Sequence, residues 1–167
     1  MRAGFLSAKV RHLVDTKYDS NRKLVNVYDE WKVLADNVHN LLTDAGKDYF
    51  HAQDYTNNGS GGVGANFIGL TESTITPATS DTTLSGEIST NGLSRVIASS
   101  RTHSAGANTS VLSKTFTASG SFTSVLASAL FNASSSGTMA HIANFGTGSG
   151  TMISGDMLAV TWTMTLS

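Results

Sequence analysis

The sequence predicts a mainly β protein: an antiparallel β-sandwich or jelly-roll-like domain with one short helix and an N-terminal arm. The first observation is the stretch 157–166, in which large apolar residues alternate with alanine and threonine. The apolar set is Leu158, Val160, Trp162, Met164 and Leu166. Side chains of a strand point alternately to its two faces, so we expect a closing strand with one buried face. The second observation is a series of short β-prone runs about 8–12 residues apart, separated by Gly, Ser and Asn turns.

The N-terminal third has a mixed pattern. Residues 5–14 fit either an amphipathic helix or an extended arm, and residues 24–34 fit one or two strands. The best helical pattern covers 40–53, where Asn40 supplies a cap and apolar residues recur at three- and four-residue spacing. We expect this helix to lie over one side of the sheet.

The rest of the chain reads as strands joined by turns. We expect strands in five further runs, and the pair Asn91-Gly92 is a strong signal for a tight turn. The runs are 67–70, 95–98, 111–118, 125–131 and 139–145.

Charge is unevenly distributed along the chain. Most ionic groups precede residue 60, and the change coincides with the glycine-rich stretch 57–64. This predicts an N-terminal unit, residues 1–60, that contains the arm, strands and short helix and serves docking or oligomerisation. Residues 61–167 would then form the β-sandwich domain.

Composition argues against several function classes. Charged residues make up 14% of the chain, against about 25% in typical globular proteins. The formal net charge is -1, so we expect neither nucleic acid nor a membrane as a partner. No cysteine is present, which leaves no disulfides and no thiolate metal site.

No group of residues predicts catalysis, a cofactor or a metal. His51 and Asp54 are three residues apart on the expected helix, with His39 earlier, but a third ligand is missing. His103 and His141 are expected at the surface or in loops. Asp29 and Glu30 are adjacent, so in a strand they would point to opposite faces.

An interface is the remaining kind of site. A surface rich in Ser, Thr and Gly suits a protein that packs beside copies or neighbours, since unpaired buried charges are costly. We expect the first 22 residues to bind a neighbouring subunit, so that deleting them abolishes this binding and leaves the sandwich folded. The candidate interface residues are Phe5, Leu6, Val10, Leu13, Val14 and Trp31.

The order and spacing of several stretches carry a resemblance. They are 40–49, 66–84, 114–118, 129–139 and 154–166, together with Gly86, Glu87 and Arg95. In these stretches the chain resembles virion structural proteins of tailed bacteriophages, over about residues 40–167.

The resemblance implies a β-sandwich that assembles into an oligomer, such as a trimer, without catalytic residues. Its partners would be other copies and the major capsid protein or other virion proteins, and it would be made in the host cytoplasm and reside in the virion. The first expectation is a capsid decoration (cement) protein on the outside of the head. A tail, neck or fibre-associated protein is the alternative. A carbohydrate-binding module comes third, because it would want exposed aromatic residues while Trp162 is expected in the core.

Overall fold

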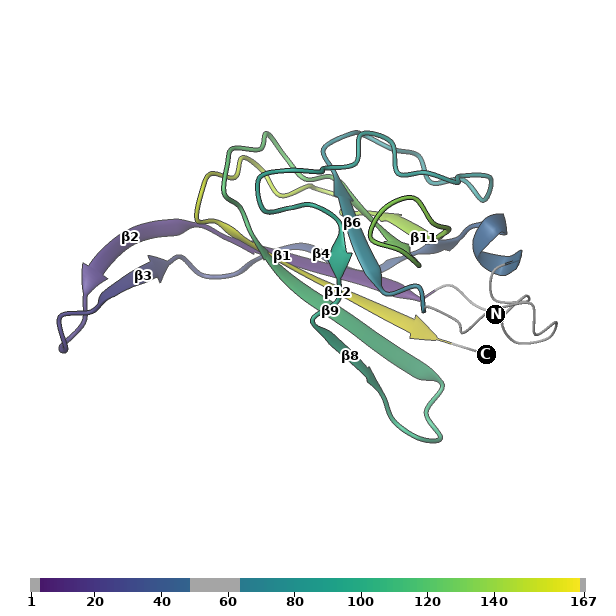
Figure 1. Cartoon of the computed structure of the whole chain (residues 1–167), viewed down its shortest axis with the longest axis horizontal. Helices are drawn as coiled ribbons and strands as arrows, with labels where there is room; N and C mark the ends of the chain where they lie inside the picture. Colours follow the sequence, from purple (N-terminus) through teal and green to yellow (C-terminus); the bar gives the residue numbers. More distant parts are fainter. Residues whose placement is uncertain (1–3, 49–63, 166–167) are drawn as a thin grey trace.

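The computed structural model describes residues 4–48 and 64–165. Two five-stranded antiparallel sheets pack against each other, and a two-stranded ribbon extends from one end (Figure 1). The first sheet has the order β4-β1-β12-β9-β8, and the second has the order β5-β11-β10-β6-β7. The strands are β1 (Phe5–Arg11), β2 (Leu13–Tyr18), β3 (Leu24–Tyr28), β4 (Lys32–His39), β5 (Leu41–Leu42), β6 (Phe67–Thr71), β7 (Val96–Ile97), β8 (Ser100–His103), β9 (Thr109–Thr117), β10 (Ala127–Phe131), β11 (Met139–Asn144) and β12 (Met157–Thr165). The predicted mainly β antiparallel sandwich with one short helix is confirmed.

The expected closing strand is β12, and it lies in the middle of the first sheet. It pairs with β1 on one side and with β9 on the other. Leu158, Val160 and Trp162 are fully buried, while the intervening Ala159 and Thr161 are half-buried on the opposite face. The predicted alternation is therefore correct from Leu158 to Trp162, while Met164 is half-buried and Leu166 lies outside the described residues. Both edges of the strand are occupied.

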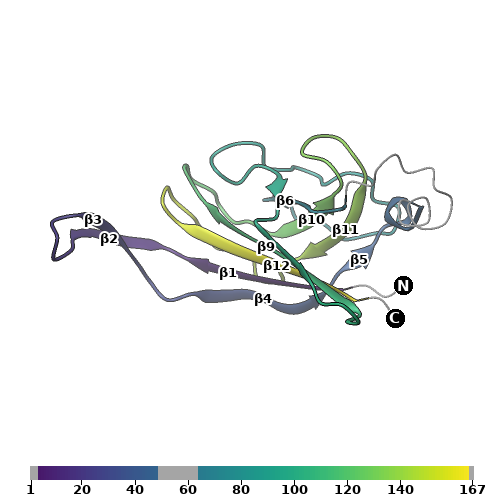
Figure 2. The same cartoon turned by 60° about the horizontal axis from the view of Figure 1, so that its bottom comes forward.

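The core lies between the two sheets. Trp162 is the largest buried side chain, and its indole Nε1–H donates to Ser128 Oγ of the second sheet at 3.3 Å. The hydroxyl of Ser128 in turn donates to the carbonyl of Gly69 at 3.0 Å. This link satisfies the indole N–H, which would be costly to bury alone. Figure 2 shows the two sheets as two layers.

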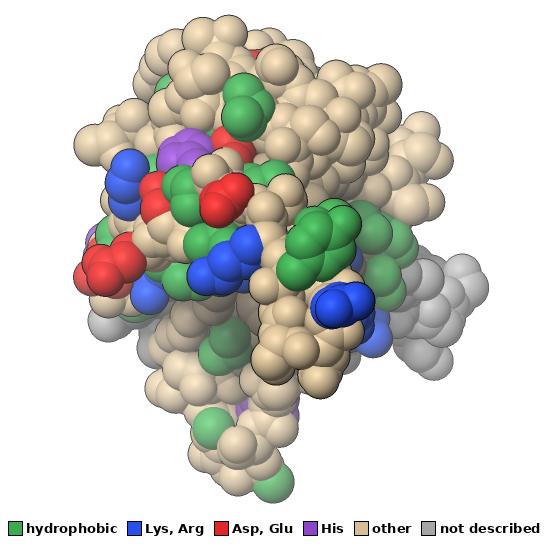
Figure 3. Space-filling model, turned by 90° about the vertical axis from the view of Figure 1, so that its left-hand side faces the viewer, with side chains coloured by type: hydrophobic (Ala, Val, Ile, Leu, Met, Phe, Trp, Pro, Cys, Tyr) green, Lys and Arg blue, Asp and Glu red, His purple; other side chains and the backbone are tan. Residues whose placement is uncertain are grey.

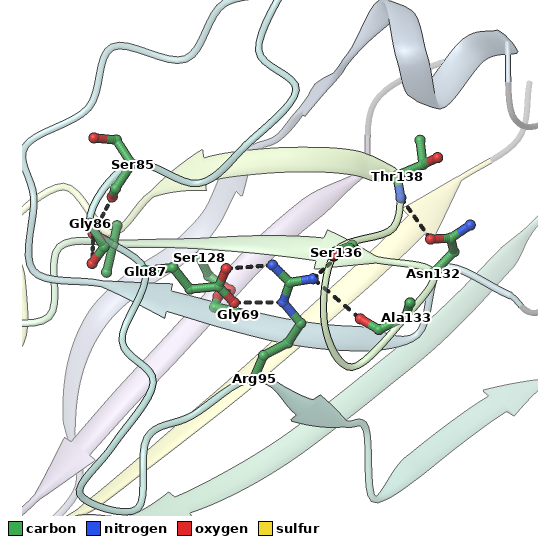
Figure 4. A network of polar contacts seen from close by, with 11 residues as sticks. Gly69, Ser85, Gly86, Glu87, Arg95, Ser128, Asn132, Ala133, Ser136 and Thr138 are labelled. Atoms are coloured by element: carbon green, nitrogen blue, oxygen red, sulfur yellow. Dashed lines mark hydrogen bonds and ion pairs between the residues drawn. The ribbon is translucent and has the colours of Figure 1, made fainter.

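The second sheet is buried on both of its faces. A long loop, residues 72–95, covers its outer face and contributes Leu84 to a second apolar cluster. Glu87 and Arg95 form a bidentate ion pair there, and Arg95 also donates to carbonyls of the 132–138 loop (Figure 4). The Arg95 guanidinium lies 3.4 Å from the ring centre of Phe131. Because every residue of β10 is buried, this strand shows no alternating polar face in its sequence.

The N-terminal segment is part of the sandwich. Residues 5–11 form strand β1 between β4 and β12 rather than a helix. Strand β5 pairs with β11 in the second sheet. The chain on either side of the predicted boundary near residue 60 therefore shares both sheets, so that boundary does not separate one sheet from the other. The higher charge of the N-terminal part reflects its exposed ribbon and edge strand.

The helix begins later than the pattern predicts. Leu41 and Leu42 form β5, and the helix starts at Asp44. Thr43 is the cap, since its Oγ1 accepts from the amide of Gly46 at 2.9 Å. Asn40, expected as the cap, is buried beside β1, where its amide donates to the carbonyl of Gly4. The remainder of the predicted helix, with His51 and Asp54, and most of the glycine-rich stretch lie outside the described residues.

Two smaller expectations have different outcomes. Asn91 and Gly92 form a turn with φ of 54° and 83°, as the dipeptide predicts. His103 is exposed on β8, but His141, also expected at the surface, is 2% exposed within β11. The surface position predicted for His141 is wrong because β11 is covered on both faces. The helix and the 72–95 loop contact one face, and the first sheet, with Trp162, packs against the other.

Candidate assembly interface

The ribbon formed by β2, β3 and the turn between them, residues 13–28, is the most prominent projection of the described molecule. We call it the arm (Figure 1); it begins later than the N-terminal arm expected from the sequence, whose residues 5–11 are strand β1 of the sandwich. The two strands pair only with each other among the described residues. Its turn is closed by Asp19, whose Oδ1 accepts from the amides of Asn21 and Lys23, both at 2.9 Å. An aspartate that bonds amides two and four residues on is a common way to stabilise a turn.

The arm carries exposed apolar side chains. Tyr18 and Leu24 lie directly opposite each other at its tip and are 71% and 56% exposed. Val14 is 59% exposed nearer the sandwich. Figure 3 views the molecule from this end and shows hydrophobic side chains next to Lys and Arg groups. A two-stranded ribbon is marginally stable alone in water, so an arm of this kind needs support.

The support at the base of the arm is a buried carboxylate. Asp156 is 1% exposed and lies in the turn that precedes β12. Its oxygens contact His12 Nδ1 at 2.7 Å and accept from the amides of Leu13 at 2.8 Å and Ile153 at 2.9 Å. Burial raises the pKa of Asp156, but the hydrogen bonds from His12 and the two amides outweigh it and lower the pKa overall.

The Arg11 side chain also holds the base of the arm in place. The Arg11 guanidinium lies 4.2 Å from the ring centre of Tyr28 and 4.7 Å from that of Trp31. Arginine over aromatic faces gains both packing and electrostatic attraction. His12 and Asp29 also pair, since the His12 amide donates to Asp29 Oδ1 at 2.6 Å and the Asp29 amide donates to the His12 carbonyl. The base of the arm is thus held in one direction while its tip is exposed, an arrangement that lowers the entropy cost of binding.

The structure separates the six candidate interface residues. Leu6 and Val10 are core residues at 0% and 1% exposure, so they cannot contact a partner in the folded chain. Phe5 is half-buried at the far end of β1, where its ring lies against that of His39. The others lie on or next to the arm: Leu13 at its base, Val14 on β2, and Trp31, 37% exposed, beside Arg11.

Sequence reasoning missed four residues of this region: His12, Tyr18, Leu24 and Asp156. Tyr18 and Leu24 flank the run Asp-Ser-Asn-Arg-Lys, and this turn-prone run was a usable signal for a hairpin. His12 and Asp156 are 144 positions apart, and no local pattern connects them.

The described residues hold no group of three or more His, Cys, Asp or Glu side chains placed to bind a metal ion. In the same part of the chain, no helix is long and apolar enough to cross a membrane. The contacts of Asp156 with His12 and with the Leu13 amide connect the base of the arm to the turn before β12, which is a structural role. Comparison of the chain with protein-family models, curated proteins and solved structures gives no match.

Proposed function

We propose that this protein is a non-enzymatic structural component of a bacteriophage particle, in which the arm contacts a neighbouring subunit. Capsid decoration is the role we favour: the protein would bind the outside of the head and stabilise the shell. The observation that carries the proposal is the arm itself, an ordered ribbon with exposed apolar side chains and a firmly held base. The resemblance over residues 40–167 supplies the virion context.

The first sheet supports the same role. Its outer face carries small and hydroxyl side chains, including Ser7, Ala159, Thr161 and Thr163. Thr161 lies between Ser7 and Ser113 on this face, where a neighbour meets only hydroxyl groups. Lys9 lies beside Ala159 on the same face, so a neighbour that covers the whole face must supply an acidic partner for Lys9. A particle component that packs side by side with others needs broad surfaces of this kind.

A tail, neck or fibre-associated role is the second candidate, and the elongated shape favours it. The arm extends from the end of the sandwich where β12 begins, and the β8–β9 hairpin lies toward the other end of β12 (Figure 1). A protein with projections at both ends is suited to connect two neighbours along a tail or fibre.

Copy number in purified particles distinguishes the two roles. Quantitative mass spectrometry against the major capsid protein should find hundreds of copies for a decoration protein. A tail, neck or fibre component would be present in a few to a few dozen copies. Absence from purified particles would overturn the virion proposal altogether.

An arm variant tests the carrying observation. Replacing residues 14–27 with a short Gly-containing turn should leave the sandwich folded and prevent incorporation into particles. Wild-type incorporation of this variant would remove the arm from the mechanism. A charge change away from both the arm and the β8–β9 hairpin, Asp48→Lys at an exposed position of the short helix, is the control and should incorporate normally.

A further inference from the structure

Strand β2 is the more exposed strand of the arm. Every residue from Val14 to Tyr18 is exposed, whereas Val25, Val27 and Tyr28 of β3 are half-buried. On the side away from β3, no strand of the described chain pairs with β2. An open strand edge is a template for pairing with another chain.

The backbone groups on this edge can be identified from the turn. The Asp19 amide donates to the Lys23 carbonyl, and bonded pairs alternate along an antiparallel ladder. Lys17 and Asp15 therefore bond toward β3, while the backbone groups of Thr16 and Tyr18 point outward. The hydrogen bond of the Thr16 amide is consistent with this outward direction, because the amide donates to the carboxylate of the preceding residue, Asp15 Oδ1, at 2.7 Å and not to β3.

The sequence of β2 is complementary to itself when it is reversed. Residues 14–18 read Val-Asp-Thr-Lys-Tyr. If two copies pair antiparallel with Thr16 opposite Thr16, then Asp15 of each copy lies opposite Lys17 of the other. Val14 and Tyr18 are matched in the same way. Opposite charges and apolar pairs directly across two strands are both stabilising, and this register supplies both kinds twice.

We infer that β2 pairs antiparallel with β2 of a second copy about a twofold axis at Thr16, forming a continuous four-stranded ribbon β3-β2-β2-β3. The inference rests on the proposed function in taking the arm as an assembly element, and it names the partner as another copy of this chain. On pairing, the Thr16 amide exchanges Asp15 Oδ1 for the partner's Thr16 carbonyl, which releases the Asp15 carboxylate to face Lys17 of the partner. A four-stranded ribbon also meets the requirement for three or more strands that an isolated hairpin lacks.

Charge reversal tests the register. The purified full-length protein should form a dimer in sedimentation velocity runs over a concentration series. Lys17→Asp places two like-charged pairs across the twofold axis, and Asp15→Lys does the same with the opposite sign. Each should weaken dimerisation at least tenfold, which corresponds to about 1.4 kcal/mol. The matched control Arg101→Asp makes the same change in net charge as Lys17→Asp but lies on β8, so its dimer should be unchanged.

Two rescue experiments separate loss of pairing from loss of folding. The double variant D15K/K17D restores opposite charges across the axis and should dimerise like the wild type. Mixing the D15K and K17D single variants should give a one-to-one heterodimer, because one chain then offers two cations and the other two anions. Thr16→Pro should abolish dimerisation and leave the arm intact, since the Thr16 amide is not bonded to β3.

Several results would overturn the inference. They are a wild-type protein that stays monomeric, a trimer or other oligomer that is insensitive to K17D and T16P, and a mixture of D15K and K17D that stays monomeric. These results are independent of the particle measurements. A monomeric protein found in purified particles would refute the β2 pairing alone, whereas a β2 dimer absent from particles would refute the proposed function alone.

Discussion

Acidification should destabilise the fold through His141. The ring is 2% exposed, with its centre 6.4 Å from that of Trp162, and burial lowers its pKa from 6.5 to about 4. As the pH falls below 6.5, the unfolded chain takes up the proton first, so stability is highest above pH 6.5 and declines toward pH 4. The difference between the two pKa values corresponds to about 3 kcal/mol in all, and to about 2 kcal/mol at about pH 5.

Urea unfolding at steps from about pH 7 to about pH 4, at constant ionic strength, measures this loss. With a slope of about 2 kcal/mol per molar urea, the midpoint should fall by about 1 M at about pH 5. His141→Leu should remove most of the decline in this range, and His103→Gln, a change at an exposed histidine, should leave it in place. The reasoning fails if the wild-type midpoint stays constant over this range, or if the His141→Leu midpoint declines as steeply as that of the wild type.

Three further predictions concern the contacts of Asp156, the Glu87–Arg95 ion pair and strand β1. Asp156→Asn removes the carboxylate that accepts hydrogen bonds from His12, Leu13 and Ile153. It should lower the free energy of unfolding in urea by about 2–4 kcal/mol and speed hydrogen exchange of the amides at the base of the arm. Unchanged exchange of the Leu13 amide would contradict this. Arg95→Met should cost about 3 kcal/mol in urea unfolding, because it leaves the largely buried Glu87 carboxylate without its ion-pair partner. R95M combined with Glu87→Gln should cost less than the sum of the single changes; additive costs would show that the two side chains act independently. Contrary to the expectation from the sequence, deleting residues 1–22 should unfold the sandwich, because β1 is removed from between β4 and β12. Replacing 14–27 with a short turn should preserve the sandwich's cooperative melting; a folded deletion variant would show that β1 is dispensable.

The sequence was most informative where a strand has one buried face and one half-exposed face. Strand β12 shows this alternation from Met157 to Thr163, and the buried side of that stretch was predicted correctly. Strand β1 was ambiguous, because Leu6 and Val10 are four residues apart and the residue between them on that face, Ala8, is small. Its identity as a strand comes from pairing with β4 and β12, a contact that no local window contains.

The surface that we propose as an interface could be predicted only in part. Val14 and Trp31 are exposed as expected, but Leu6 and Val10 are buried, since an apolar residue has the same sequence signature in a core and in an interface. Asp156 was not identified because its partners His12 and Leu13 are supplied by the other end of the chain. The location of the arm follows from the Asp19 turn, while its direction depends on those distant contacts.

The pairing of β1 with β12 also determines the order in which the protein can fold. These strands are adjacent in the first sheet, yet β12 is synthesised after all the other strands of the described residues. On the ribosome β1 can pair with β4 early, but its other edge must wait for β12, while the β2–β3 hairpin can close at once from neighbouring residues. Folding that depends on such distant contacts is slow. We therefore expect the arm to form early and the first sheet to be completed only after β12 has emerged.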